Sequence, residues 1–399
     1  MIDKTICELF AGVGGFRVGL ENSDKEWNTV WANQWEPGKK SQHAFDCYIS
    51  HFGNKEEYIN EDIATIDKET IPNHNLLVGG FPCQDYSVAS TGAKGIEGKK
   101  GVLWWQIRDI LEAKSPKFVL LENVDRLLKS PASQRGRDFG VILACFNDLG
   151  YTVEWRVINA ADYGFAQRRR RIFIFAYKNT TNYYENLENT RLSDIIHKDG
   201  FFVKQFAIED STTGKEYPFE YEDIMDISNN FGLDFKNSGI MRNNVIYTED
   251  IIPILEDSTT LRKIIVPDAD EKYNLGEDLE KWQYLKGPKD ILRTSQTGFQ
   301  YHFREGGVAF PDSLDKPART MLTSEASVNR STHVIQDPLT DKLRLLTPVE
   351  TERINGFPDN WTNTGMPESF RYFTMGNALV VGIITRLGNE LNKIFENEE

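Results

Sequence analysis

Short apolar runs alternate with longer segments of helical character through residues 1–178. Each run has the length and apolar content of a buried strand. Helices are predicted between the runs, including one that begins at Arg17 and one over Val141–Leu149. Strands that alternate with helices are typical of a doubly wound α/β fold with a parallel sheet. The predicted strands are Thr5–Leu9, Thr29–Ala32, Leu76–Val78, Lys117–Leu121, Thr152–Asn159 and Ile172–Tyr177.

The alternation is lost over residues 190–340, where aromatic side chains are scattered among turn residues. We expect a second, smaller, mostly β or irregular domain there, reached through a polar linker at 178–189. Regular signals return near the C-terminus, where Thr347 is placed to cap a helix with Pro348 at its first position and Glu350 three residues after the cap. A final helix is predicted from Val381 to about Phe395.

Composition adds limits rather than a function. At 399 residues the chain is long for one core, so two domains are expected. The formal net charge of −14 counts against a nucleic-acid partner, although a local basic region can still bind phosphates. The four cysteines show no C-x-x-C spacing, which favours a reducing cytoplasm and predicts neither a disulfide framework nor a metal site. We find no signal peptide and no apolar run near the ~20 residues of a membrane helix, so we expect a cytoplasmic protein without membrane contact.

The stretch Gly79–Ser87 (GGFPCQDYS) directly follows one of the predicted strands. Its cysteine, Cys83, lies just past the strand's carboxyl end, where open α/β sheets place their chemistry, and Pro82 stiffens the turn. The next loop, 88–101, contains four glycines and three lysines, a composition typical of a mobile lid over an anionic ligand. The alternative is a small buried cysteine in a turn, the commoner fate of a lone cysteine.

Two other turns carry candidate ligand-binding groups. The glycine-rich turn Phe10–Phe16 lets backbone approach a ligand closely, and alone it fits NAD, FAD, S-adenosylmethionine or merely a tight turn. Its F-x-G-x-G-G spacing makes a dinucleotide less favoured than the G-x-G-x-x-G pattern would. Trp35, after the second strand, is suited to stack on an adenine or to fill the core. Asp62 is either an acceptor for a purine amino group or a helix N-cap.

Charged groups follow two more strands. Glu122 lies at the carboxyl end of the strand after the one that leads to Cys83, so we expect both at the same edge of a parallel sheet. A buried carboxyl there can have a raised pKa and act as an acid, and the alternative is a cap for the following helix. In the run Gln167–Arg171, Arg169 and Arg171 fall on one face of a strand and can point at an anion or a base edge. Such an arginine run is most often a solvated face.

Taken together and in this order, these segments resemble the DNA (cytosine-5) methyltransferase family, in its compact prokaryotic members of the restriction-modification type. The resemblance covers residues 1–178 and about 315–399, and the middle of the chain lacks a motif that we can place. The matching segments are Phe10–Phe16, Glu61–Ile63, Gly80–Gln84, Glu122–Val124, Gln167–Arg171, Leu345–Pro358 and Gly376–Ala378.

The resemblance implies a Rossmann-like fold of the kind found in S-adenosylmethionine-dependent methyltransferases. It also implies an enzyme that transfers a methyl group from S-adenosyl-L-methionine to C5 of a cytosine flipped out of double-stranded DNA. It implies that Cys83 is the nucleophile, that Glu122 pairs with N3 of the base, and that Arg169 and Arg171 orient the base. Cofactor contacts are expected at Phe10, Gly12, Val13, Gly14, Gly15, Gln34, Trp35, Asp62, Ile63, Pro82, Leu103, Asn377 and Leu379. DNA contacts are expected at Gln84, Ser87, Lys99 and Lys100. Arg293 and Arg304 are further candidates, because they are basic side chains in the turn-rich middle of the chain, and the alternative is that they are ordinary surface groups of a β domain.

One departure leaves a question open. The family commonly has an acidic residue for the cofactor ribose just before the tryptophan that follows strand two. This chain has Gln34 at that position and Glu36 two residues further on, so either can make the contact.

The predicted division assigns residues 1–178 and 370–399 to a catalytic and cofactor-binding domain and residues 179–369 to a target-recognition domain with a hinge. We expect DNA between them and a monomer without an obligate protein partner. Two alternatives remain open: a tRNA cytosine-5 methyltransferase with the same motifs, and a catalytically silent DNA-binding module. The absent G-x-G-x-x-G disfavours a flavin or NAD oxidoreductase. The motifs determine neither the recognised DNA sequence nor the role of the loop at 131–139.

Overall fold

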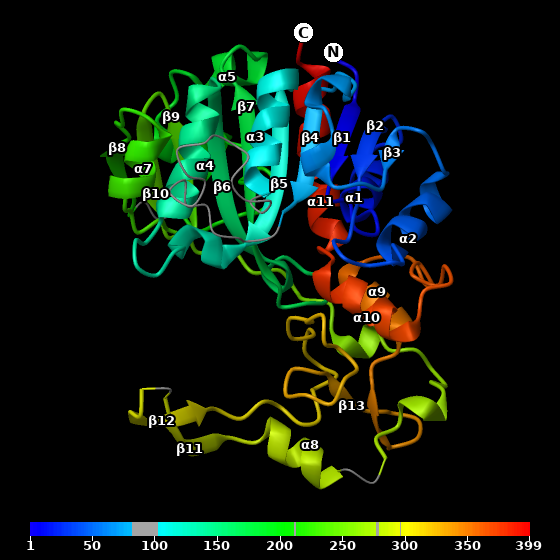
Figure 1. Ribbon diagram of the computed structural model, residues 1–399. Helices are drawn as coiled ribbons and strands as arrows, with labels where there is room; N and C mark the ends of the chain where they lie inside the picture. The colour runs from blue at the N-terminus through cyan, green and yellow to red at the C-terminus, as the bar shows by residue number, and fades with distance from the viewer. Residues whose placement is uncertain (82–102, 211–212, 277–278, 296) are drawn as a thin grey trace.

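The computed structural model is built around one large mixed sheet with helices on both faces (Figure 1). It describes residues 1–81, 103–210, 213–276, 279–295 and 297–399. In spatial order the strands of this sheet are β3 (Tyr58–Ile59), β2 (Asn28–Asn33), β1 (Thr5–Leu9), β4 (Leu76–Gly80), β5 (Phe118–Val124), β7 (Arg170–Lys178), β6 (Tyr151–Asn159), β9 (Ser238–Arg242), β10 (Val245–Glu249) and β8 (Lys215–Pro218).

The first five strands in that order are parallel, and the remaining pairings are antiparallel. The order β3-β2-β1-β4-β5, with a helix in each long connection between parallel neighbours, is the doubly wound pattern predicted from the sequence. The α/β fold is therefore confirmed. The six predicted strands all form, within one or two residues of their expected bounds except at β5, which runs three residues further toward its carboxyl end.

The described residues form eleven α-helices, and only some of them cover the faces of the sheet. They are α1 (Gly15–Ser23), α2 (His43–Phe52), α3 (Leu103–Lys114), α4 (Arg137–Asp148), α5 (Asn182–Leu187), α6 (Leu192–Asp194), α7 (Ile224–Asn230), α8 (Leu279–Lys286), α9 (Pro348–Asn355), α10 (Glu368–Asn377) and α11 (Val381–Glu396). On one face α3 and α4 pack against alternate strand residues such as Leu77 and Val119. On the other face α1 and α11 cover the intervening residues, such as Val78 and Leu120. The sheet is thus buried on both sides, as parallel sheets require.

The C-terminal segment returns to the sheet through α9, α10 and α11. Thr347 caps α9 in a reciprocal capping box with Glu350, as predicted, and Gly356 ends the helix with φ 80°. Helix α11 begins at Val381, also as predicted, and packs beside α1. Both termini therefore lie at the same end of the sheet, the end opposite α9 and α10 (Figure 1).

A smaller region projects beyond α9 and α10 (Figure 1). It contains α8 and two two-stranded sheets, one of β11 (Lys289–Thr294) and β12 (Gln300–Glu305), the other of β13 (Val334–Gln336) and β14 (Leu343–Leu345). The expectation of a small, mostly β or irregular region is met here. The hairpin β11–β12 is its far extremity.

Three details of the predicted organisation are wrong. Strands β9, β10 and β8 extend the large sheet from β6, so residue 178 is not an edge of the sheet, and part of 179–369 belongs to its body. The expected linker at 178–189 contains α5, which Thr181 caps and whose Leu187 is buried. Helix α4 begins at Arg137, four residues before the predicted start at Val141, so the end of the loop at 131–139 is already helical. In each case apolar side chains far away in the sequence supply the packing that local polarity concealed.

Candidate active site

The carboxyl ends of β4 and β5 lie side by side, because Gly80 of β4 pairs with Glu122 of β5. A Cβ on Gly80 would lie 3.2 Å from Glu122 Oε2, so glycine leaves room for this carboxyl. The described part of β4 and its turn ends at Phe81, which is buried. Cys83, and with it Pro82, Gln84, Ser87, Lys99 and Lys100, lies outside the described residues.

Glu122 and Arg171 form an ion pair at this edge. Arg171 Nε lies 2.8 Å from Glu122 Oε1, and the two side chains are 18% and 13% exposed. The strands explain the contact: Glu122 pairs with Phe173 of β7, and Arg171 is two residues away on the same face. Burial raises the pKa of the Glu122 carboxyl above its ordinary value, although the guanidinium groups of Arg171 and Arg169 pull it down. Glu122 lies within the strand, not at a helix cap, so the capping alternative is excluded.

Arg169 holds backbone instead of pointing into open space. Its side chain is buried and donates to the carbonyl oxygens of Met321 (3.3 Å), Gly376 (3.1 Å) and Asn377 (3.2 Å). Burial, together with the charge of Arg171, lowers its pKa to about 9. Arg169 lies just before β7 and connects this strand to α10 and to the segment at 321. Within the arginine run only Arg171 contacts Glu122 in the described residues.

The glycine-rich turn after β1 is fixed by the end of β2. Gly12 donates its N–H to Gln34 Oε1 at 2.7 Å, and Ala11 donates to the carbonyl of Asn33 at 3.0 Å. Gly12 and Gly14 have φ of 55° and 88°, where glycine is favoured. In the part of the chain that the structure describes, no atom lies within 4 Å of the position of a Cβ on Gly12, so these residues leave one side of the turn open. The turn therefore has the shape of a cradle for a ligand.

Gln34 and Glu36 face different partners. Gln34 reaches the glycine-rich turn, whereas the Glu36 carboxyl accepts from the backbone N–H of Ala44 in α2. Burial raises the pKa of Glu36. Trp35 between them is half-buried. Gln34 is thus the residue of the two that lies against the cradle.

The loop after β3 joins the same end of the sheet. Asn33, which the sequence did not single out, donates its side chain to the carbonyl of Glu61 at 2.9 Å and so ties this loop to β2. Asp62 Oδ1 accepts from the N–H of Ala64 at 3.0 Å, so Asp62 caps the short helix that follows through this oxygen, and a contact of its other oxygen with a cofactor stays a prediction. Ile63 is buried in the core cluster against which Leu103, the first residue of α3, also packs.

The C-terminal segment closes the other side of the glycine-rich turn. A Cβ on Gly15 would meet the Leu379 side chain at 3.1 Å, and Trp361 Nε1 donates to the carbonyl of Val13 at 2.8 Å. Asn377 is exposed at the end of α10. One end of the sheet thus brings together residues that are far apart in sequence, namely those near 10–15, 34, 62 and 377–379. Phe10, at the start of the glycine-rich turn, has a φ of 54°.

One buried carboxyl at this end was missed from the sequence. Glu8 of β1 is fully buried and accepts a hydrogen bond from the Tyr48 hydroxyl at 2.8 Å. Arg17 of α1 donates to the hydroxyls of Tyr58 (2.7 Å) and Tyr48 (3.3 Å). Burial raises the pKa of Glu8 to about 7. The signal was available, since Glu8 is the charged residue in an otherwise apolar strand next to the turn.

The two predicted DNA-contacting arginines of the small region lie on the hairpin β11–β12. Arg293 stacks over the ring of Phe303, with 3.7 Å between the guanidinium carbon and the ring centroid. Arg304 Nε donates to Asp290 Oδ2 at 3.1 Å, and its side chain is 74% exposed. The hairpin also exposes Phe299 and Leu292. It lies in the smaller region, away from β5, the strand that carries Glu122 (Figure 1).

The loop at 131–139 is held by protein, not left open. Gln134 donates to the carbonyl oxygens of Ser228 (3.2 Å) and Phe231 (2.9 Å), and Arg135 pairs with Asp234 at 2.6 Å. A Cβ on Gly136 would lie 2.1 Å from the carbonyl of Leu233. The loop therefore serves to dock residues 228–235, which pack α7 against α4.

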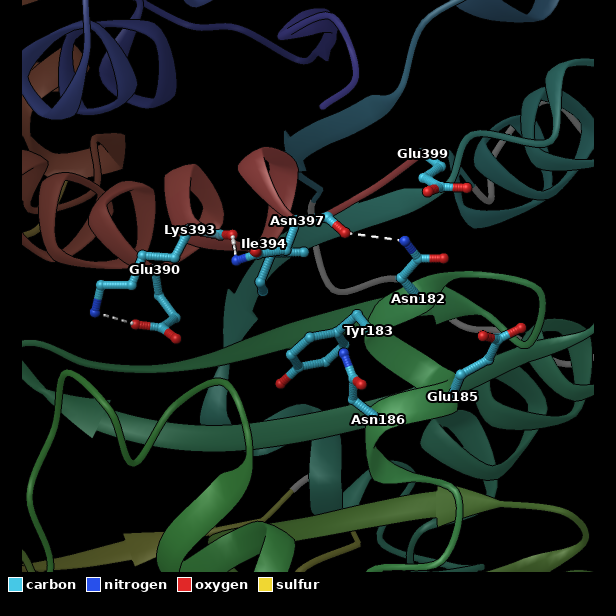
Figure 2. Close-up of a pocket in the computed structure, with 9 residues that line it drawn as sticks. All are labelled: Asn182, Tyr183, Glu185, Asn186, Glu390, Lys393, Ile394, Asn397 and Glu399. Carbon is cyan, nitrogen blue, oxygen red and sulfur yellow. Dashed lines mark hydrogen bonds and ion pairs between the residues drawn. The ribbon is translucent and has the colours of Figure 1, made fainter.

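A pocket of about 590 Å³ lies at the opposite end of the sheet (Figure 2). It is bounded by α5 and the end of α11, and Tyr183, Glu390 and Lys393 are among its lining residues. The adjoining Glu399 carbonyl accepts from Lys117, directly before the amino end of β5. This pocket is thus separated from Glu122 by the length of the strand, and it is not the site of the converging motifs.

Comparison with known proteins decides what this arrangement belongs to. Residues 4–393 match the family model described as C-5 cytosine-specific DNA methylase. The chain belongs to the C-5 cytosine-specific DNA methylase family. It is therefore a DNA (cytosine-5) methyltransferase, as the motifs predicted.

Two curated relatives illustrate the range of similarity. The type II methyltransferase M.Sau3AI of Staphylococcus aureus is 55% identical over 397 residues, which are 98% of this chain and 95% of the relative. The type II methyltransferase M.HhaI of Haemophilus parahaemolyticus is 34% identical over 204 residues, covering 51% of this chain and 57% of the relative. With M.Sau3AI, the similarity includes the middle of the chain, in which the sequence offered no motif.

Solved structures support the fold. The methyltransferase EhMeth of Entamoeba histolytica matches with a TM-score of 0.57 at 17% identity, covering all of this chain and 99% of that one. The Dnmt2 methyltransferase of S. pombe matches with a TM-score of 0.58 at 14% identity, covering 98% of both chains. At these identities the likeness concerns the fold alone.

Of the helices that the structure describes, none combines the length and the apolar character needed to cross a membrane.

Proposed function

We propose that this methyltransferase uses S-adenosyl-L-methionine as methyl donor, double-stranded DNA as substrate and Cys83 as covalent nucleophile. The observation that carries the proposal is the Glu122–Arg171 pair beside the carboxyl end of β4. Strand β4 ends at Gly80, three residues before Cys83 in the sequence. An acid with a raised pKa and a cysteine at adjacent strand ends are the two groups that cytosine C5 chemistry requires.

The roles follow from the chemistry of the base. Cytosine C5 is a poor nucleophile, so the Cys83 thiolate adds to C6 while Glu122 donates a proton toward N3. This addition gives C5 the electron density of an enamine carbon, which takes the methyl group. Loss of the C5 proton then expels the Cys83 thiolate and restores the ring. Arg171 holds Glu122 in place and keeps its orientation toward the base.

The residues around the glycine-rich turn fit the proposed cofactor. Among the described residues the turn is open beside Gly12, and Gln34 lies against it, whereas the Glu36 carboxyl is bound to α2. We therefore assign the ribose contact to Gln34, whose amide nitrogen can donate to a hydroxyl. Trp35, Asp62, Ile63, Asn377 and Leu379 remain cofactor candidates because they converge on the same end of the sheet. When bound there, S-adenosyl-L-methionine supplies the methyl group.

Target recognition is proposed for the region beyond α9 and α10, with the large sheet and residues 370–399 as the catalytic part. A two-stranded ribbon fits the major groove of B-DNA, and the hairpin β11–β12 offers exposed Arg293 and Arg304. The contact of Arg304 with Asp290 uses Nε, so the terminal amino groups can still read a guanine. By similarity to the type II relatives, we propose sequence-specific modification of DNA in a restriction-modification setting.

Methylation mapping tests the proposal. Bisulfite sequencing of DNA from cells that express the protein should show methylated cytosines at one short sequence, and Cys83→Ser should abolish them. The same variant should bind S-adenosyl-L-methionine within a few-fold of the wild type, because its neighbours contact the cofactor. Methyl incorporation into tRNA but not into duplex DNA would favour the alternative substrate, and turnover by the serine variant would refute the covalent mechanism.

A further inference from the structure

The hairpin β11–β12 stands apart from the body of the protein (Figure 1). Most of its side chains are exposed on both faces, including Leu292, Phe299 and Tyr301. An isolated two-stranded hairpin is only marginally stable in water. Its direction must therefore be set where it joins the rest of the small region.

Arg330 binds both roots of this hairpin. Its Nη1 donates to the carbonyl oxygens of Leu285 and Gly287, each at 3.1 Å, on the side that leads into β11. Its Nη2 donates to the carbonyl of Gly306, on the side that leaves β12. Its Nε lies 3.6 Å from Glu305, the last residue of β12. One planar guanidinium thus spans the two strands where they enter and leave the hairpin.

Arg330 lies in a turn that is held by several hydrogen bonds. The flanking turn is held by Asn329, whose Oδ1 accepts from the N–H groups of Ser331 (2.7 Å) and Thr332 (3.1 Å). Arg319, paired with Asp312 at 2.7 Å, also donates to the carbonyl oxygens of Ser331 and Thr332.

The segment that holds this turn, residues 319–332, also contacts the catalytic part of the enzyme. Met321 lies two residues after Arg319 in the chain, and its carbonyl accepts a hydrogen bond from Arg169. Gly376 packs so closely on Leu322 that a Cβ would lie 2.4 Å from its carbonyl carbon. Arg330 therefore couples the hairpin to the segment that contacts the catalytic sheet.

We propose that Arg330 is a positioning residue that fixes the direction of the hairpin and thereby sets how well the enzyme discriminates its target sequence. The inference rests on the proposed reading of DNA by β11–β12. A hairpin held in its reading direction needs little further ordering when it binds, whereas a loosened hairpin must be ordered at the expense of affinity. Base contacts need that direction, while contacts with phosphates tolerate variation.

The test uses the full-length enzyme and duplexes that carry either the site mapped by bisulfite sequencing or single-base changes of it. Arg330→Met keeps the side-chain stem and removes every N–H donor. Its KM for the mapped site should rise on the order of tenfold, with kcat within about threefold. The ratio of kcat/KM between the mapped and altered sites should fall. Arg330→Lys keeps the charge but cannot span both roots, so an intermediate ratio is expected.

A matched control is available in α9. Arg353 is 31% exposed, donates to the carbonyl of Ile264 at 3.0 Å and pairs with Asp359 at 2.6 Å, compared with 22% exposure for Arg330. Arg353→Met removes a similar set of bonds away from the hairpin and should leave discrimination unchanged. Melting temperatures of all variants show whether they fold. If Arg330→Met does not fold, the change in discrimination is measured on Arg330→Lys instead.

The hairpin variants Arg293→Ala and Arg304→Ala separate the two ideas. If they reduce discrimination and folded Arg330 variants do not, the role of Arg330 is overturned while the reading hairpin stands. If neither the hairpin variants nor the Arg330 variants change discrimination, the proposed reading by the hairpin fails, and the inference fails with it. Equal loss of discrimination in Arg353→Met would also overturn the inference, since the effect would then be general loosening.

Discussion

Replacement of Glu8 by Gln should change how the stability of the enzyme depends on pH. Glu8 is fully buried under α1 and accepts from Tyr48, and Arg17 lies in the same network. Burial raises the pKa of its carboxyl to about 7 from an ordinary 4.5. Gln can accept the same hydrogen bond from Tyr48 but never carries a charge.

The difference between these pKa values corresponds to about 3 kcal/mol. Between about pH 4.5 and about pH 7 the folded protein keeps a proton on Glu8 that the unfolded chain releases. The contribution of Glu8 is therefore fully present below about pH 4.5 and is lost as the pH rises to about 7. Glu8→Gln has no such loss, so its unfolding free energy relative to the wild type should rise by about 3 kcal/mol between about pH 4.5 and about pH 8.

Urea unfolding followed by tryptophan fluorescence, at both pH values, measures this difference directly. Glu56→Gln, at an exposed position of the same part of the chain, serves as the control and should stay within about 0.5 kcal/mol of the wild type. A relative stability of Glu8→Gln that is the same at both pH values would refute the reasoning, because Glu8 would then be equally protonated in the folded and unfolded chains.

Three further predictions concern activity. Glu122→Gln should lower kcat by on the order of 10²–10⁴-fold, and an unchanged kcat would contradict the acid role. Initial rates of wild-type methylation, measured against pH, should fall as the pH rises past the raised pKa of Glu122. Gln34→Ala should weaken S-adenosyl-L-methionine binding in calorimetry while leaving DNA affinity unchanged, and equal cofactor affinity would reassign the ribose contact. Exchange of residues from about 185 to about 335 with those of a relative of different specificity should transfer the methylated site, and a chimera that methylates the original site would place readout elsewhere. Since that segment includes β8–β10, a second chimera limited to 279–306 tests whether the hairpin region suffices.

The local sequence determined the elements that depend on neighbouring residues. Apolar runs predicted β1, β4 and β5, because a strand buried on both faces needs only continuous apolar side chains. The capping box at Thr347 and the start of α11 at Val381 followed from residues within one helical turn. The ordered motifs identified the family and placed Glu122 beside the strand that leads to Cys83, which needs only the rule that parallel strands end at one edge.

Tertiary structure decided what depends on partners far away in sequence. Arg169 and Arg171 look equivalent in the chain, yet one binds Glu122 and the other binds carbonyl oxygens of Met321 and α10, more than 150 positions later. The choice depends on what the returning C-terminal segment brings to each side chain, and periodicity carries no such information. The same holds for Gln34, whose partner is the Gly12 N–H, and for Arg330, which spans the two roots of a hairpin. The alternation of side chains along a strand fixes which face a group takes, whereas the group that it meets there is set by how distant segments pack.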